Sequence, residues 1–175
     1  TTLFRSRYRS RDAESIEAEV AALLRRGVKE INLVAQDTTA YGQDSGGAYN
    51  LASLLSRLDR LEGDFWIRLL YTYPALITDE LLAAIGQSKH VCRYLDIPLQ
   101  HVSDRVLKRM GRRGSRGEIR ELIAKVRRVL PGVAIRSTFI LGYPGETEED
   151  FQELLAFLAE VKLDWVGVFP YSREE

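Results

Sequence analysis

The sequence has 175 residues, 45% of them hydrophobic and 29% charged, which is enough for one globular domain with a core and is not typical of disordered or low-complexity chains. Its 25 basic and 25 acidic residues give a formal net charge of +0. The chain therefore has no overall electrostatic attraction to nucleic acid or membranes. No apolar stretch approaches the roughly 20 residues of a membrane span, and we expect a cytoplasmic protein without membrane partners.

Helical and strand patterns alternate along the sequence, as in repeated βαβ units. Apolar spacing predicts helices around 16–24, 51–58, 81–86, 102–110, 119–130 and 151–158, and β-prone runs predict strands at 31–35, 65–71, 93–97, 133–141 and 166–169. Two pairs, Ser115 with Glu118 and Thr147 with Asp150, are typical helix caps. We expect one domain over residues 1–175, a partial parallel (βα) TIM-type barrel whose first strand is missing.

In parallel barrels, the side chains at the carboxyl ends of the strands form the active-site face. These predicted ends carry hydroxyls, amides and aromatic rings, in the segments 36–38, 71–74, 100–101, 136–138 with 142–146, and 170–172. Amides suit ribose and carboxylate groups, and apolar walls suit adenine. The rim therefore favours a ligand with a nucleoside end and an amino-acid end over acid-base hydrolysis.

Several of these residues also have purely structural explanations. Asp37 could cap the turn after its strand, and Gln100 could bond to the backbone. The basic loop 108–113 is either solvated surface or places an arginine over the mouth of the site. His90 is expected to lie exposed in a loop. The lone Cys92 is expected to be a small buried residue, and it cannot by itself hold zinc or an iron-sulfur cluster.

Four strings in one order resemble the radical S-adenosylmethionine (SAM) core of the methylthiotransferases: VAQDTTAYG at 34–42, YLDIPLQH at 94–101, KRMGRRG at 108–114 and RSTFILGYPGET at 136–147. The residues at 35–38 and 136–139 are similar to the RimO branch, which adds a methylthio group to the β-carbon of an aspartate in small-subunit ribosomal protein twelve. The tRNA-modifying branch, MiaB, typically has Gly-Gln-Asn and Ser-Thr-Asp there. The resemblance thus implies this ribosomal protein, free or on the ribosome, as the partner.

The family resemblance implies two cofactors, SAM and 4Fe-4S clusters. In the family, the string that resembles residues 5–11 follows the C-x-x-x-C-x-x-C loop that holds the first cluster. We therefore expect this sequence to begin after that loop, without the first strand, the N-terminal methylthiotransferase domain and the C-terminal TRAM domain. The chain alone is expected to hold no cluster and to be inactive.

The same resemblance implies a set of SAM-binding residues, and no catalytic or metal-ligating ones, within this sequence. Three of them stand where the family receives the methionine amino group, and the others face SAM, its ribose, its carboxylate or its adenine: Ala35, Gln36, Asp37, Tyr71, Gln100, Arg112, Thr138 and Ile140. Many relatives carry an acid where this chain has Thr138. In the implied mechanism a SAM-derived radical removes hydrogen from the aspartate β-carbon, a second cluster delivers sulfur, and another SAM supplies the methyl group.

Three other functions remain open at this stage. The first is methylthiolation of a tRNA adenosine. The second is a metal-independent barrel enzyme whose loop 142–145 holds a phosphate at the start of the helix near Thr147. The third is a non-catalytic module that docks on the ribosome through the arginines at 5, 7, 9 and 11, although these could equally form a solvated edge and give no strong nucleic-acid signal.

Overall fold

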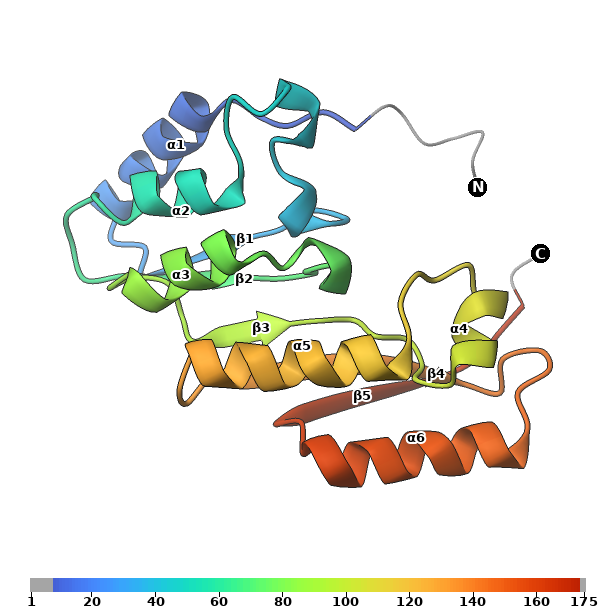
Figure 1. The fold of residues 1–175 in the computed structure, drawn as a ribbon. Helices are drawn as coiled ribbons and strands as arrows, with labels where there is room; N and C mark the ends of the chain where they lie inside the picture. The colour runs from blue at the N-terminus through green and yellow to red at the C-terminus, as the bar shows by residue number, and fades with distance from the viewer. Residues whose placement is uncertain (1–7, 174–175) are drawn as a thin grey trace.

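The computed structural model describes residues 8–173, in which five parallel strands alternate with helices (Figure 1). The elements are α1 (Ala13–Arg25), β1 (Glu30–Leu33), α2 (Leu51–Leu58), β2 (Trp66–Leu69), α3 (Asp79–Gln87), β3 (Tyr94–Asp96), α4 (Asp104–Arg109), α5 (Arg116–Val129), β4 (Ala134–Leu141), α6 (Glu148–Val161) and β5 (Trp165–Pro170). Short 3₁₀ turns occupy 38–40, 43–45 and 74–76. The predicted alternation is confirmed, with boundaries that shift by a few residues.

The strands follow one another in space in chain order, in two hydrogen-bonded sheets. β1 pairs with β2, and β4 lies between β3 and β5, all in parallel. The two sheets meet at a narrow seam, where Ile67 bridges to Val91 and the Thr72 backbone NH donates to the Asp96 carbonyl at 2.9 Å. β1 and β5 are the two edges, so residues 8–173 form the predicted partial parallel arrangement as an open sheet and not as a closed barrel.

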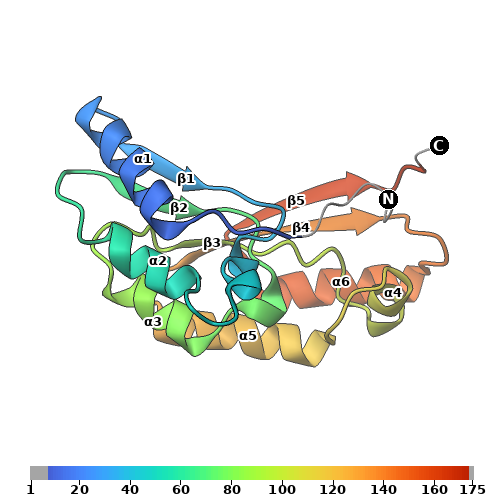
Figure 2. The same cartoon turned by 90° about the horizontal axis from the view of Figure 1, so that it is seen from above.

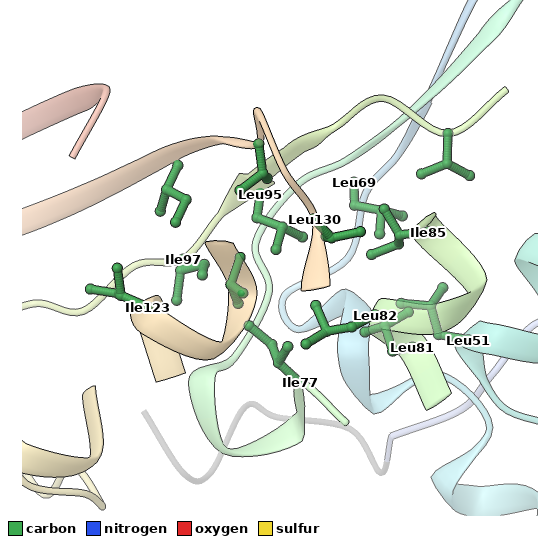
Figure 3. Packing of buried hydrophobic residues seen from close by; sticks show 14 of the residues in the cluster. Leu51, Leu69, Ile77, Leu81, Leu82, Ile85, Leu95, Ile97, Ile123 and Leu130 are labelled. Carbon is green, nitrogen blue, oxygen red and sulfur yellow. The ribbon is translucent and has the colours of Figure 1, made fainter. Parts of the chain in front are cut away.

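The helices α2, α3, α5 and α6 cover one face of the strands and leave the other face free of helices (Figure 2). Between the strands and these helices lies the core, whose aliphatic side chains come from both layers (Figure 3). Leu82 of α3 and Leu95 of β3 are completely buried there. Burial of one such side chain contributes about 1.5–3 kcal/mol. None of the helices within the described part of the chain is long and apolar enough to cross a membrane.

Both predicted helix caps are confirmed as capping boxes, at the start of α5 and at the start of α6. The prediction for His90 is wrong, because its ring is buried and stacks on Phe65 with centroids 3.9 Å apart. That contact joins residues 25 positions apart in the chain, which the local pattern does not reveal. Cys92 is partly exposed and not the buried residue that we expected.

Candidate functional site

A cavity of about 520 Å³ lies at the carboxyl ends of the strands. Eleven residues from five strand ends and one loop line it: Gln36, Asp37, Tyr71, Thr72, Tyr73, Pro98, Gln100, Arg112, Arg136, Thr138 and Phe169. Six of the eight residues expected to bind SAM are among them. The fold therefore brings together side chains that the sequence spreads over about 100 positions.

Two cavity residues have a left-handed backbone although they are not glycine. Tyr71 has φ 57° and Gln100 has φ 71°. Neighbouring strands hold both in place: the Tyr71 carbonyl accepts from the Thr38 backbone NH at 3.0 Å, and Gln100 exchanges backbone hydrogen bonds with Thr138 and Ile140 at 2.9 and 2.8 Å. Such a conformation costs of order 1–3 kcal/mol and is concentrated at functional sites. Backbone hydrogen bonds to neighbouring segments thus hold both residues in this conformation.

Asp37 has a structural role as well as a place in the cavity wall. Its carboxylate accepts from the Thr39 hydroxyl and from the Ala40 backbone NH at 3.2 Å, so it does cap the turn after β1. The Thr39 hydroxyl oxygen in turn accepts from the Tyr73 backbone NH at 2.9 Å. This chain of bonds fixes the loop after β1 to the loop after β2, and with it two sides of the cavity.

Arg112 reaches the cavity because of the way α4 ends. Gly111, with φ 67°, terminates the helix, and the backbone NH of Arg112 then donates to the Leu107 carbonyl at 2.9 Å. This pattern is a Schellman motif, which favours glycine at the left-handed position. The basic loop is therefore divided between the two expected roles: Arg112 lines the cavity, whereas Arg109 packs on the loop after β4, where its Nε donates to the Pro144 carbonyl at 3.0 Å.

Arg136 and Phe169 line the cavity although the sequence reasoning did not select them. Arg136 of β4 donates through Nη1 to Asp96 Oδ1 of β3 at 2.8 Å, and Asp96 is only 1% exposed. Arg136 and Thr138 alternate along one strand, so they share a face. The two-residue spacing from Thr138 could have identified Arg136 from the sequence. Phe169 lies on β5 at the register position of Ile140.

Two of the expected residues, Ala35 and Ile140, lie outside the set that lines this cavity. Ala35 lines a neighbouring hollow between α1 and β1, and Ile140 follows Thr138 on the same face of β4, one step further along the strand. Ala35 directly precedes Gln36 in the sequence, and Ile140 is two residues after Thr138. Their neighbours Gln36 and Thr138 do line the cavity.

The loop 142–145 is occupied by side chains of the chain itself. A Cβ on Gly145 would lie 2.7 Å from Cζ of Arg109, and the backbone NH of Tyr143 donates to Glu146 at 3.0 Å. The first turn of α6 carries three acids, Glu148, Glu149 and Asp150. A helix start that is already capped and acidic repels an added anion. The geometry therefore argues against the phosphate-binding alternative.

The described residues offer SAM a chemically matched cavity but offer a 4Fe-4S cluster no ligands. Guanidinium, amide, hydroxyl and aromatic groups converge in the cavity, as an amino-acid and nucleoside ligand requires. In contrast, residues 8–173 contain no group of three or more His, Cys, Asp or Glu side chains that could hold a metal. Cys92 is the single cysteine of the sequence, and it does not line this cavity. Thiolates for a cluster are therefore not supplied by this sequence.

The sequence model of the radical SAM superfamily matches residues 2–158. A protein of Pelotomaculum thermopropionicum named ribosomal protein uS12 methylthiotransferase RimO is 56% identical over 171 residues, and one of the same name from Opitutus terrae is 52% identical over 184 residues. Each alignment covers 98% of this chain but only 38% and 39% of the relative. The chain thus spans about two fifths of the length of these relatives.

Two solved structures have a similar fold. The radical SAM methyltransferase TsrM from Kitasatospora setae, with cobalamin and a [4Fe-4S] cluster bound, gives a TM-score of 0.73 at 15% identity and covers 94% of this chain and 32% of that one. Coproporphyrinogen III oxidase HemN from Escherichia coli gives 0.65 at 20% identity and covers 93% and 38%. At these identities, the likeness concerns the fold alone.

Proposed function

We propose, because the chain belongs to the radical SAM superfamily, that its strand-end cavity binds SAM within a methylthiotransferase that modifies an aspartate of small-subunit ribosomal protein twelve. The observation that carries the SAM assignment is the convergence of Gln36, Gln100 and Arg112, from three separate segments, in one cavity. The names of relatives at 52–56% identity support the methylthiotransferase and the ribosomal protein substrate.

The proposed roles follow from the chemistry of each group. Arg112 donates to the SAM carboxylate, as a charge-assisted partner. Asp37, with the carbonyls at Ala35 and Gln36, receives the methionine ammonium group. Gln100 donates its amide hydrogens to the ribose or the carboxylate.

The remaining cavity residues bind the nucleoside part of SAM. The Thr138 hydroxyl meets the ribose, Ile140 lies next to the adenine, and the ring of Tyr71 covers one side of the cofactor. SAM itself supplies the radical-forming and methyl-donating chemistry of the family. The residues of this chain supply binding, orientation and the exclusion of water. The cluster ligands lie outside this sequence, and no step through a cluster is assigned to these residues.

The SAM assignment is tested by equilibrium binding of SAM to Arg112→Gln and to a matched control, Arg128→Gln. Both remove one exposed arginine charge, but Arg128 lies in α5 and not on the cavity. Loss of one charge-assisted contact, about 1.5–3 kcal/mol, weakens binding roughly 10- to 150-fold. We expect this loss for Arg112→Gln alone. Equal affinities of the two variants would refute the role of Arg112.

The enzymatic assignment is tested on the whole gene product that contains this sequence, after anaerobic iron-sulfur reconstitution. We expect 5'-deoxyadenosine from SAM and a methylthio adduct on the aspartate of ribosomal protein twelve, presented either free or in small subunits. Unmodified tRNA serves as the alternative substrate. A protein that takes up a cluster and leaves SAM intact would refute the SAM role of the cavity, and an adduct on tRNA alone would refute the proposed substrate.

A further inference from the structure

The cavity contains two arginines but only one carboxylate that is free to face a ligand. Arg112 and Arg136 line it, and Asp37 is the acid in the lining set. Asp96, the carboxylate nearest to Arg136, is almost completely buried beneath it. The carboxylate of Asp37 is partly used by the cap of its own turn. The ion pair with Asp96 balances the charge of Arg136, so the cavity offers an anionic ligand group the unused donors of its two guanidinium groups and no net positive charge.

Arg136 is held in a fixed position by buried groups. One nitrogen, Nη1, donates to Asp96 Oδ1 at 2.8 Å, and the other oxygen, Oδ2, accepts from the Tyr71 backbone NH at 3.4 Å. The hydrogen bond to Asp96 also raises the pKa of the Arg136 guanidinium above its ordinary value. Arg136 is thus a permanent cation whose orientation the strands β3 and β4 determine.

The rest of the guanidinium is available to a ligand. The Arg136 side chain is 37% exposed, and within residues 8–173 its Nε and Nη2 donate no hydrogen bond. On β5, Trp165 is the register partner of Arg136 and Gly167 is that of Thr138; a Cβ on Gly167 would lie 3.8 Å from Arg136 Nη2 and 3.2 Å from the Thr138 methyl group. The lack of a side chain at Gly167 keeps this side of Arg136 open. A guanidinium edge with two free donors is suited to one carboxylate.

SAM supplies one carboxylate, and under the proposed function Arg112 binds it. We propose that Arg136 binds the side-chain carboxylate of the residue that is modified, and so selects an aspartate over its neutral analogue asparagine. This inference rests on the proposed function, because it assumes that SAM occupies Arg112. It assigns Arg136 a substrate-binding role, in which the buried Asp96 is the positioning residue.

The test compares two substrates in one enzyme preparation, which cancels any difference in the folded fraction. The whole gene product is assayed with a peptide that carries aspartate at the modified position and with the same peptide carrying asparagine there. The measured quantity is the ratio of the two kcat/KM values for 5'-deoxyadenosine formation, with the SAM Kd measured in parallel. We expect the wild type to prefer aspartate roughly 10- to 150-fold, as one charge-assisted contact allows.

Two variants of Arg136 and one control separate substrate binding from a structural role. We expect Arg136→Gln to bring the ratio close to one with little change in the SAM Kd. Arg136→Lys keeps the charge beside Asp96, so it should fold like the wild type, and we expect an intermediate ratio because the planar fork is lost. Arg112→Gln should show the reverse behaviour, a weaker SAM Kd and an unchanged ratio.

Several results would overturn the inference. A wild type without preference for aspartate, or a preference that persists in both Arg136 variants, would leave Arg136 as a structural partner of Asp96. A rise of tenfold or more in the SAM Kd of Arg136→Gln, with the preference intact, would make Arg136 a SAM ligand instead. If the wild type does not cleave SAM at all, the proposed function itself fails, and this result is distinct from an altered ratio.

Discussion

Replacement of Asp150 by alanine tests how strongly the loop before α4 is attached to the start of α6. The Asp150 carboxylate is 8% exposed and accepts hydrogen bonds from the Ser103 hydroxyl at 2.6 Å, from the Thr147 backbone NH at 2.8 Å and from the Thr147 hydroxyl at 2.9 Å. The Arg105 guanidinium also donates to it. Alanine removes all of these bonds and leaves Ser103 without its acceptor.

The expected cost follows from the number and burial of these bonds. Removal of one partner from a buried charged network typically costs about 3–5 kcal/mol. At this chain length, 1 kcal/mol corresponds to about 2–4 °C in Tm. We therefore expect Asp150→Ala to lower the free energy of unfolding by about 3–5 kcal/mol and the Tm by roughly 6–20 °C.

The same effect should depend on pH in a defined direction. Burial alone would raise the pKa of Asp150, but the hydrogen bonds from Ser103, Thr147 and Arg105 outweigh it and hold this pKa well below its ordinary value. A carboxylate whose pKa is lower in the folded state stabilises the fold fully above its unfolded pKa of about 3.9, and less as pH falls toward the folded pKa. The difference between wild type and Asp150→Ala should therefore shrink below about pH 4.

Urea unfolding at pH 7 and at pH 3, followed by circular dichroism, measures both effects. Glu148→Ala is the control, because Glu148 is an exposed acid in the same turn and such surface changes usually stay within about 0.5 kcal/mol. A cost below about 1 kcal/mol for Asp150→Ala at pH 7, or a gap that is the same at pH 3, would refute the reasoning.

Two further predictions concern residues with positive φ. Gly42 has φ 84°, and a Cβ there would lie 2.1 Å from the Tyr49 carbonyl oxygen, so Gly42→Ala should cost more than about 2 kcal/mol in urea unfolding. Gly46→Ala, with φ 67° and open space, should cost only about 1 kcal/mol, and equal costs would contradict the steric argument. Gln100→Gly relieves a left-handed backbone, so we expect a Tm that is unchanged or higher together with weaker SAM binding. A lower Tm, or an unchanged SAM Kd, would contradict this.

The sequence predicted the elements of the fold well, because their signals are local. The pair Ser115 and Glu118 marks the start of α5 without reference to the rest of the chain. Short β-prone runs and helical spacing likewise identify the strands and helices. The burial of His90 was missed because it depends on Phe65, in a different βα unit.

The candidate site was predicted in part. Gln36, Gln100 and Thr138 were identified from motifs and do line one cavity. Arg136 was overlooked because its importance depends on Asp96 of the neighbouring strand, and the pairing register that joins them is a property of the sheet. A motif gives the residue types at a strand end, but only the register gives their neighbours across the sheet.

The seam between β2 and β3 gives ligand binding a mechanical consequence. Gln36, Asp37 and Tyr71 follow the strands of one sheet, β1 and β2. On the other side of the seam, Gln100 follows β3, and Arg136 and Thr138 lie on β4. Few backbone hydrogen bonds cross between the described parts of the two sheets. A molecule that fills the cavity contacts residues on both sides of the seam and so links the two sheets. At a free ligand concentration of 100 times Kd, binding raises the free energy of unfolding by about 2.7 kcal/mol. Backbone amides along the seam, such as that of Cys92, should then exchange with solvent more slowly and in step with the rest of the chain.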